Sequence, residues 1–442
     1  MWELFVFYAR WCLLNALRSG ITRGSFALIE GDTIHRFGEN QEQMTKNSPS
    51  AVIKVQNGNF WSRIYTAHDL GFAEAYMHGD FSGSPSDVKA VLDLWLANRH
   101  NLTSLSSVLS WSVSKLSALY VMAFGQSLSN ARLNVITGYD VSNEFFHKLL
   151  GETMQYSCAL WPEHAGGIRG DVDGVWKETD LDTAQTYKLR SVLRRARVRP
   201  GDRLLEFGCG WGSLSIEAAK MGCIVDTLTL SVEQKEWAEG RIRAEGLERR
   251  ITVHLLDYRR LPQDFEHRFD AFVSIEMLEH VGVKWLPTYF KIIEWALKPG
   301  RATAVMTATS MPDFRFGKYQ SEDYARRYQW PNAFLPSPTY LAAVADRTWR
   351  GKMALESIED HTHHYPRTLR EWGRRLQMHW VPETVRDLVQ RHPELSDPDV
   401  LAMFKRKWEY MCVYAEIGFA RAYTSCHQWT FTRPENIVAR CD

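Results

Sequence analysis

Residues 203–212 read RLLEFGCGWG, an apolar stretch typical of a β-strand that runs into three alternating glycines. Residues 211–222 continue with the spacing of a helix, so the glycines predict a tight strand-to-helix turn. Glycine lets the backbone turn sharply and approach a ligand, and the start of a helix presents free N–H groups to an anion. The pattern predicts a ligand-binding turn, although a turn that only connects a strand to a helix would show the same glycines.

Alternating strand and helix patterns surround this turn from Pro200 onward. The strand-like segments are residues 202–210, 224–231, 251–258, 269–277 and 301–310. Helical segments follow the first two strands. Such an alternation predicts an α/β fold with a Rossmann-like, doubly wound parallel sheet, in which ligands bind at the carboxyl ends of the strands.

The glycine pattern distinguishes two classes of ligand. A dinucleotide site needs G-x-G-x-x-G, but the third glycine would fall on Ser213, and Asp226 is the only candidate for its ribose-binding acid. The E-x-G-x-G-x-G form of residues 206–212 instead suits S-adenosylmethionine. Asp257, which ends the third strand, is placed to contact the adenine. The predicted contacts within the turn are Glu206, Gly208, Gly210 and Gly212.

The segments on either side of these strands have different patterns. Residues 1–138 mix short strand-like runs with helical ones, such as 25–31 and 86–102, and predict a smaller α+β region. Residues 139–442 form the second domain, in which 311–400 lack the strand–helix alternation and predict a helical, aromatic cap. The chain closes with one more helix and a final strand.

Two apolar stretches raise the question of membrane contact. The N-terminal stretch carries Glu3 and Arg10, and segment 107–124 carries Lys115, so neither offers the roughly 20 apolar residues of a spanning helix. The N-terminal stretch predicts a helix docked on the protein's own core. In the alternative, its aromatic residues rest on a membrane surface. With no secretory signal evident, we expect a cytoplasmic protein, either soluble or peripheral at a membrane.

The composition excludes several other classes of protein. Of the 442 residues, 45% are hydrophobic and 24% are charged, which are the values of a globular chain. Lys and Arg number 53 against 52 Asp and Glu, so the net charge of +1 gives no electrostatic case for a nucleic-acid partner. The 7 cysteines lack metal-binding spacing, which argues for reduced thiols and against a metal site.

Six short segments occur in a fixed order along the chain. They are Tyr139–Asn143, Gln155–Ala159, Thr229–Gln234, Glu276–Gly282, Phe334–Ser337 and Tyr365–Leu369. Together they resemble the cyclopropane fatty acid synthase and mycolic acid cyclopropane synthase family. The resemblance is dense from Tyr139 to Pro434 and loose in the N-terminal region, and the number and order of the motifs make it specific.

The resemblance implies a methyltransferase that uses S-adenosylmethionine to alkylate a carbon–carbon double bond of an unsaturated lipid, with cyclopropane formation as the default outcome. It allows a homodimer and a peripheral membrane contact. Two alternatives remain. One is a methyltransferase that acts on a small specialised metabolite with a terpenoid-like alkene, and the other is a catalytically inactive lipid-binding relative. Residues at matching positions would contact the cofactor: Tyr156, Ser157, Gly208, Gly210, Thr229, Leu230 and Gln234.

The resemblance also implies a catalytic group. Methyl transfer to an alkene leaves a carbocation, and a base must then remove a proton from the transferred methyl group to close the ring. Members of the family hold a bicarbonate ion for this step, and its ligands map onto Cys158, Glu279, Tyr365 and the main chain near Ala308. Apart from the resemblance, Glu279 would be interpreted as a helix-start carboxylate and Cys158 as a small buried hydrophobe.

The sequence departs from the family pattern at three positions near this site. Met306 and Gly138 stand where the family has histidine, and Ala415 stands where it has cysteine. These losses predict a changed pocket. They count against bicarbonate binding, and they leave open a methyl-branched or exomethylene product and a different alkene substrate, but they do not affect methyl transfer itself.

Overall fold

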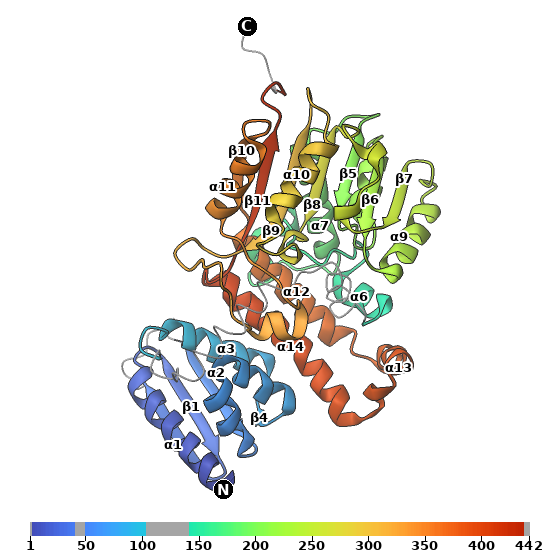
Figure 1. Cartoon of the computed structure of the whole chain (residues 1–442). Coiled ribbons are helices and arrows are strands. Elements are labelled where there is room, and N and C mark those ends of the chain that lie inside the picture. Colours follow the sequence, from blue (N-terminus) through green and yellow to red (C-terminus); the bar gives the residue numbers. More distant parts are fainter. Residues whose placement is uncertain (1, 40–48, 103–140, 437–442) are drawn as a thin grey trace.

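The computed structural model describes residues 2–39, 49–102 and 141–436 and folds them into two units (Figure 1). A small unit holds the N-terminal sheet, and a larger unit holds a seven-stranded sheet. Long helices of the C-terminal part lie between the two units in Figure 1. The predicted fold, a Rossmann-like domain preceded by a smaller α+β region, is confirmed.

The N-terminal unit is a four-stranded sheet packed against three helices. Its strand order is β2-β1-β3-β4, with β1 parallel to β3 and antiparallel to β2. Alternate strand residues such as Phe26, Leu28 and Ile53 are buried, because a strand turns every second side chain towards the helices. The bounds are α1 (Trp2–Gly20), β1 (Ser25–Glu30), β2 (Thr33–Gly38), β3 (Ser50–Val55), α2 (Asn59–His78), β4 (Phe81–Ser82) and α3 (Pro85–Ala97).

Helix α1 docks one face on this unit and exposes the other. Ala9, Leu13 and Leu14 are buried, which confirms the docked helix. The exposed large side chains are Trp2, Leu4, Phe7, Tyr8 and Trp11. Their contact with a membrane surface stays a prediction. Among the described residues, no helix is both long and apolar enough to cross a membrane. Segment 107–124 and Gly138 lie outside the described residues.

The sheet of the large unit has the strand order β10-β11-β9-β8-β5-β6-β7. Strands β5 to β9 pair in parallel, and β11 is antiparallel to both of its neighbours. The predicted parallel core is confirmed. The final strand, β11, pairs antiparallel with β9 at the edge of this core and with β10 on its other side. The bounds are β5 (Arg203–Phe207), β6 (Ile224–Thr229), β7 (Ile251–Leu255), β8 (Ala271–Ile275), β9 (Thr303–Ser310), β10 (Ala354–Asp360) and β11 (Ser425–Thr432).

Helices cover both faces of this sheet. Leu204 of β5 packs in an apolar cluster with α7, α8 and α9, whereas the next residue, Leu205, packs in a second cluster with α10 and α11. A sheet buried on both faces needs such apolar runs in its strands. The bounds are α6 (Asn143–Leu150), α7 (Asp180–Arg195), α8 (Ser213–Lys220), α9 (Val232–Ala244), α10 (Leu286–Ala296) and α11 (Pro338–Trp349).

The cap between β9 and β11 differs from the helical insertion expected over residues 311–400. It contains α12 (Tyr365–Met378), α13 (Pro382–Arg391) and α14 (Pro398–Ala420), but residues 354–360 form β10 at the edge of the main sheet. This strand exposes most of its side chains and carries acidic residues, as edge strands do, so it lacks the apolar run that would predict it. The cap leaves and rejoins the sheet at one point, where the hydroxyls of Ser310 and Ser425 are 3.0 Å apart.

Helix α14 joins the cap to the N-terminal unit. Tyr76 of α2 donates a hydrogen bond of 2.9 Å to Glu409 of α14, and Lys89 of α3 pairs with Glu416. Glu416 also accepts a hydrogen bond of 3.3 Å from Arg370 of α12. These contacts therefore tie the cap to the N-terminal unit, and two cap helices to each other.

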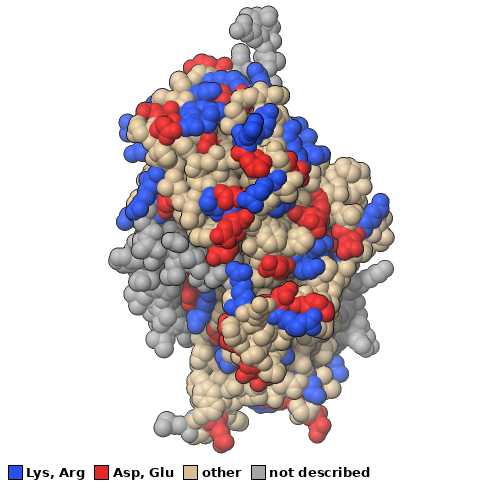
Figure 2. Space-filling model, turned by 90° about the vertical axis from the view of Figure 1, so that its right-hand side faces the viewer, with Lys and Arg blue, Asp and Glu red and all other residues tan. Residues whose placement is uncertain are grey.

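The charged surface is mixed. On the face shown in Figure 2, Lys and Arg side chains are interspersed with Asp and Glu, as expected for a net charge of +1. Arg195, the last residue of α7, pairs with Glu359 of β10, and Arg197, two residues further on, pairs with Glu356 of β10. These arginines therefore support the edge of the sheet.

Candidate active site

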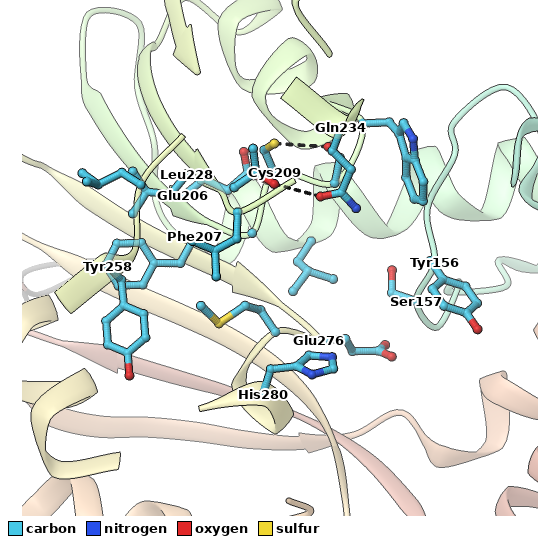
Figure 3. Close-up of a pocket in the computed structure, with 18 of the residues that line it drawn as sticks. Tyr156, Ser157, Glu206, Phe207, Cys209, Leu228, Gln234, Tyr258, Glu276 and His280 are labelled. Carbon is cyan, nitrogen blue, oxygen red and sulfur yellow. Dashed lines mark hydrogen bonds between the residues drawn. The ribbon is translucent and has the colours of Figure 1, made fainter. Parts of the chain in front are cut away.

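A cavity opens at the carboxyl ends of β5, β6 and β8, where the alternating pattern predicts ligand binding (Figure 3). It encloses about 1120 Å³ of empty space, its open mouth included. Nine of the ten residues predicted to bind a cofactor line it, and Gly212 does not. The nine are Tyr156, Ser157, Glu206, Gly208, Gly210, Thr229, Leu230, Gln234 and Asp257.

The glycine turn forms one wall of the cavity and depends on left-handed backbone. Gly208, Gly210 and Gly212 have φ angles of 86°, 50° and 89°, which side chains with a Cβ rarely adopt. A Cβ on Gly208 would lie 3.1 Å from Met277, and one on Gly212 would lie 3.1 Å from Ala238 of α9. A Cβ on Gly210 would meet no protein atom within 4 Å. Gly210 therefore leaves room for a ligand, whereas Gly212 makes room for helix packing.

Glu206 ends β5 at the base of the cavity. Its Oε2 accepts hydrogen bonds of 2.5 Å from Ser215 and 2.7 Å from Thr227. Its side chain is nearly inaccessible to solvent, and this burial raises the pKa of Glu206 to about 7, against the effect of the two hydroxyl donors.

The end of β6 is held by a compact set of hydrogen bonds. Thr229 donates to Gln234 Oε1 at 2.9 Å, and Ser231 caps α9 by accepting from the Gln234 N–H at 3.1 Å. These bonds fix both Thr229 and Gln234 on the wall of the cavity. The end of β6 thus presents the Thr229 hydroxyl, and the start of α9 the Gln234 amide, where a generic nucleotide site has an acid.

The two aspartates considered for nucleotide contacts have different surroundings. Asp257 lines the cavity, and its carboxylate is held by Arg259 through bonds of 2.9 Å and 2.6 Å. Asp226 lies inside the sheet, where it accepts 3.0 Å from Arg203 and lies 2.9 Å from His254 Nε2. Asp226 does not line the cavity. A dinucleotide site would therefore lack the acid that binds the ribose.

Aromatic rings surround Tyr156 at the mouth of the cavity. The centroid of its ring lies 5.2 Å from that of Trp372, 5.9 Å from Trp330 and 6.5 Å from Trp408. Trp372 and Trp408 are buried and come from the cap helices α12 and α14. The cap therefore supplies two of the rings that pack around Tyr156, which itself lines the cavity. Such rings stabilise cations through their faces.

Glu276, directly after β8, is a functional candidate that sequence reasoning did not single out. Its Oε1 accepts the main-chain N–H of Cys158 at 2.7 Å, and its Oε2 accepts the hydroxyl of Tyr365 at 2.5 Å. Its φ of 46° is unusual for a residue with a side chain, and such strain clusters at functional sites. In Figure 3 its carboxylate points towards the side of the cavity formed by Tyr156 and Ser157.

The structure brings the predicted residues Cys158 and Tyr365 together around this carboxylate. Cys158 is buried, and burial raises the pKa of its thiol. The thiol of Cys426 on β11 lies 3.9 Å from Glu276 Oε1. The ring of Tyr365 stacks on Phe419 at 4.1 Å. Neither Cys158 nor Tyr365 lines the cavity, but both are hydrogen-bonded to Glu276, which does.

Glu279 is buried one turn beyond Glu276. Its Oε1 accepts the N–H of Thr309 at 2.5 Å, and its Oε2 has no hydrogen-bond partner. Burial and the nearby Glu276 raise the pKa of Glu279 to about 8. His280, which lines the cavity, has its pKa lowered to about 4 by burial, and its Nδ1 also lacks a partner.

Of the three departures from the family pattern, Met306 and Ala415 do not line the cavity, and Gly138 lies outside the described residues. Met306 on β9 lies opposite Trp429 in the apolar cluster that packs against α10 and α11, and it does not line the cavity. Ala308 is also buried there. Ala415 belongs to α14 and is partly buried against the apolar cluster that this helix shares with the N-terminal unit. The described residues contain no cluster of three or more potential metal ligands, and the six described cysteines are free thiols.

Comparison with known proteins places this architecture in a family. The family model described as mycolic acid cyclopropane synthetase matches residues 126–429, more than half of the chain. The tuberculostearic acid methyltransferase UfaA1 of Mycobacterium tuberculosis is 32% identical over 82% of this chain and 79% of that protein. The cyclopropane-fatty-acyl-phospholipid synthase of Escherichia coli is 29% identical over 82% of this chain and 83% of that protein.

Solved structures show the same fold at lower identity. The cyclopropane synthase MmaA2 from Mycobacterium tuberculosis aligns with a TM-score of 0.55 and 21% identity, over 68% of this chain and 98% of its own. Coclaurine N-methyltransferase aligns with a TM-score of 0.61 and 17% identity, over 81% of this chain and 98% of its own. From the family model and these relatives, the chain belongs to the mycolic acid cyclopropane synthetase family of S-adenosylmethionine-dependent methyltransferases.

Proposed function

We propose that this protein transfers a methyl or methylene group from S-adenosylmethionine to a carbon–carbon double bond of an unsaturated lipid. The observation that carries the proposal is the placement of the Glu276 carboxylate between Cys158 and Tyr365, beside the cofactor-type cavity. Relatives named for fatty-acid, phospholipid and sphingolipid substrates favour a lipid.

The cavity fits the cofactor. Gly210 would allow its backbone to approach the ligand, while Thr229 and Gln234 offer hydrogen-bond groups to the ribose and methionine portions. Asp257, held by Arg259, would contact the adenine, and Tyr156 and Ser157 would contact the methionine end. When bound, S-adenosylmethionine supplies an electrophilic methyl group on a sulfonium cation.

The aromatic lining suits the charge that the reaction creates. An alkene is a weak nucleophile, so the site must align it and exclude water. Attack by the alkene leaves a carbocation on the lipid. Tyr156 lines the cavity, where its ring is placed to stabilise such a cation, and the rings of Trp330, Trp372 and Trp408 pack around it with centroids 5.9 Å, 5.2 Å and 6.5 Å away.

Glu276 is the base in this proposal. Three of the groups expected to hold bicarbonate are Cys158, Glu279 and Tyr365, and the structure already contains a side-chain carboxylate bonded to two of them. Glu276 would take one proton from the transferred methyl group, leaving the product neutral and its own carboxyl protonated. A second carboxylate anion in the same place would be repelled, so we propose that this protein works without bicarbonate.

Deuterium labelling tests the proposal. The protein receives S-adenosylmethionine with a trideuterated methyl group and vesicles of a dioleoyl phospholipid. Mass spectrometry should find two deuterium atoms in the product, because the base removes one from the transferred methyl group. A proton spectrum then distinguishes a ring from an exomethylene group. Three retained deuterium atoms would contradict Glu276 as the base acting on that methyl group.

Two further outcomes would contradict the lipid substrate. Label that enters a soluble terpenoid alkene but no phospholipid would favour a methyltransferase of small metabolites. Binding of S-adenosylmethionine without transfer to any unsaturated compound would favour the catalytically inactive relative.

A further inference from the structure

Lys188 of α7 is a buried cation behind the wall of the cavity. It is 3% exposed, and it does not line the cavity itself. Its Nζ donates hydrogen bonds of 2.7 Å to Ser157 Oγ and 2.8 Å to Gln155 Oε1. Gln185, almost one turn earlier on the same helix, donates to the carbonyl oxygens of Ser157 at 2.9 Å and Gln155 at 3.3 Å. Helix α7 therefore holds this segment from behind.

The ammonium group also decides the direction of the Ser157 hydroxyl. An ammonium can only donate, so Ser157 Oγ must accept from Lys188. The hydroxyl proton of Ser157 is then left to donate elsewhere, and Ser157 lines the cavity. The next residue, Cys158, gives its main-chain N–H to Glu276. Lys188 therefore helps to position Ser157 in the wall of the cavity and, through it, Cys158, whose N–H binds the proposed base Glu276.

Burying a lysine is costly unless anions are close. The carboxylates of Glu276 and Glu206 both interact electrostatically with Lys188 and favour its charged form. Burial nevertheless lowers the pKa of Lys188 to about 8. Burial raises the pKa of Glu276 above its ordinary value, and the hydrogen bonds from Tyr365 and the Cys158 N–H, together with the charge of Lys188, act against this rise.

We propose that Lys188 is a positioning residue that fixes residues 155–158 and supplies the positive charge that keeps the Glu276 carboxylate ionised for proton removal. This inference rests on the proposed role of Glu276. The other titratable groups that face Glu276 are the hydroxyl of Tyr365, the thiols of Cys158 and Cys426 and the carboxyl of Glu279. None of these four carries a positive charge, whereas the Lys188 ammonium does.

The pH dependence of turnover tests the charge. With dioleoyl phospholipid vesicles and S-adenosylmethionine, kcat of the wild type should rise with pH as Glu276 ionises. Lys188→Met removes the cation, which raises the pKa of the carboxyl group and should move this rise by at least about one pH unit to the alkaline side. Below the rise, kcat should fall about tenfold per unit and recover at higher pH. Lys188→Arg keeps the charge and should keep the position of the rise.

Gln185→Met is the matched control on the same helix. It removes hydrogen bonds to the same segment without changing any charge, so it should raise KM for S-adenosylmethionine and leave the pH of the rise unchanged. If kcat of Lys188→Met rises at the same pH as in the wild type and only KM is altered, the electrostatic role is overturned. If Lys188→Met does not fold, Lys188→Gln, which keeps an N–H donor, gives the neutral comparison.

A double variant separates this inference from the proposed function. In a Glu276→Gln background, Lys188→Met should cause little further loss of kcat, because its effect passes through Glu276. Losses that multiply independently would overturn the inference. A wild type that transfers no methyl group would instead contradict the proposed function.

Discussion

The hydroxyl of Tyr365 donates a hydrogen bond of 2.5 Å to the carboxylate of Glu276, a residue 89 positions earlier in the chain. Tyr365 begins α12 in the cap, whereas Glu276 follows β8 in the main sheet. The bond therefore ties the orientation of the proposed base to the seating of the cap. Because the Tyr365 ring also stacks on Phe419 of α14, two cap helices fix this hydroxyl.

Changing Glu276 to glutamine should reduce kcat much more than changing Glu279 to glutamine. Glu276→Gln removes the proposed base and should lower kcat by about 100-fold to 10,000-fold, with little change in S-adenosylmethionine affinity. Glu279→Gln keeps an oxygen for the Thr309 N–H and puts a neutral amide in place of a carboxyl whose pKa is raised to about 8, so its loss of kcat should be smaller. Turnover assays and calorimetry check both. Equal losses in the two variants would contradict the assignment of the base.

Bicarbonate should have no effect on the wild type, because Glu276 already occupies the hydrogen-bond donors of Cys158 and Tyr365. Glu276→Gly would empty that place and remove the carboxylate. We expect this variant to be nearly inactive in bicarbonate-free buffer and to regain activity as bicarbonate is added. Chloride at the same ionic strength serves as the control. Stimulation of the wild type by bicarbonate would show that Glu276 does not replace the ion.

Gly210→Val should abolish S-adenosylmethionine binding in a protein that still folds. The added side chain would occupy space where no protein atom lies within 4 Å of a Cβ, on a residue that lines the cavity. Gly246→Val is a matched control, since Gly246 also has a positive φ, of 67°, and an open Cβ position, but lies outside the cavity wall. Both variants should lose similar stability from backbone strain. Calorimetry should detect lost affinity only in Gly210→Val.

Glu206 should make the stability of the protein depend on pH. Its pKa is raised from 4.5 to about 7 in the folded state, so between these values the folded chain keeps a proton that the unfolded chain releases. Stability from this group is therefore greatest at low pH and falls as pH rises towards 7. Glu206→Gln removes the effect, and from pH 5 to pH 8 it should gain about 2 kcal/mol relative to the wild type.

Urea unfolding at the two pH values, without cofactor, measures this difference. Glu248→Gln at an exposed position is the control and should behave like the wild type at both values. A Glu206→Gln variant that tracks the wild type from pH 5 to pH 8 would show that the carboxyl is ionised in the folded protein throughout.

The strands around the glycine turn could be predicted from the sequence because each is a short apolar run that ends at a polar or glycine residue. Strand β10 could not, since its exposed, acidic residues follow the rules of a sheet edge rather than of a core. Its pairing depends on β11, which lies far along the chain.

The site was predictable to a similar degree. The order of the motifs predicted Cys158, Tyr365 and the residues that line the cavity. The proposed role of Glu276 depends instead on its positive φ and on hydrogen bonds to Cys158 and Tyr365, which lie 118 and 89 positions away in the chain. The pair of acids in residues 276–279 was the available signal, and the resemblance pointed to Glu279, whose catalytic role stays a prediction. Lys188 carried no signal of its own, because a lysine on a helix with basic neighbours is usually exposed.

The insertion of β11 between β9 and β10 has a consequence for synthesis of the protein on the ribosome. Ser425 of β11 pairs with Ser310 of β9, which is made 115 residues earlier. At translation rates of about 5–20 residues per second, β9 waits about 6–23 seconds for its partner. During that time its edge offers unpaired backbone groups to any passing strand. Nascent or truncated chains that end before β11 should therefore depend on chaperones and aggregate when these are scarce.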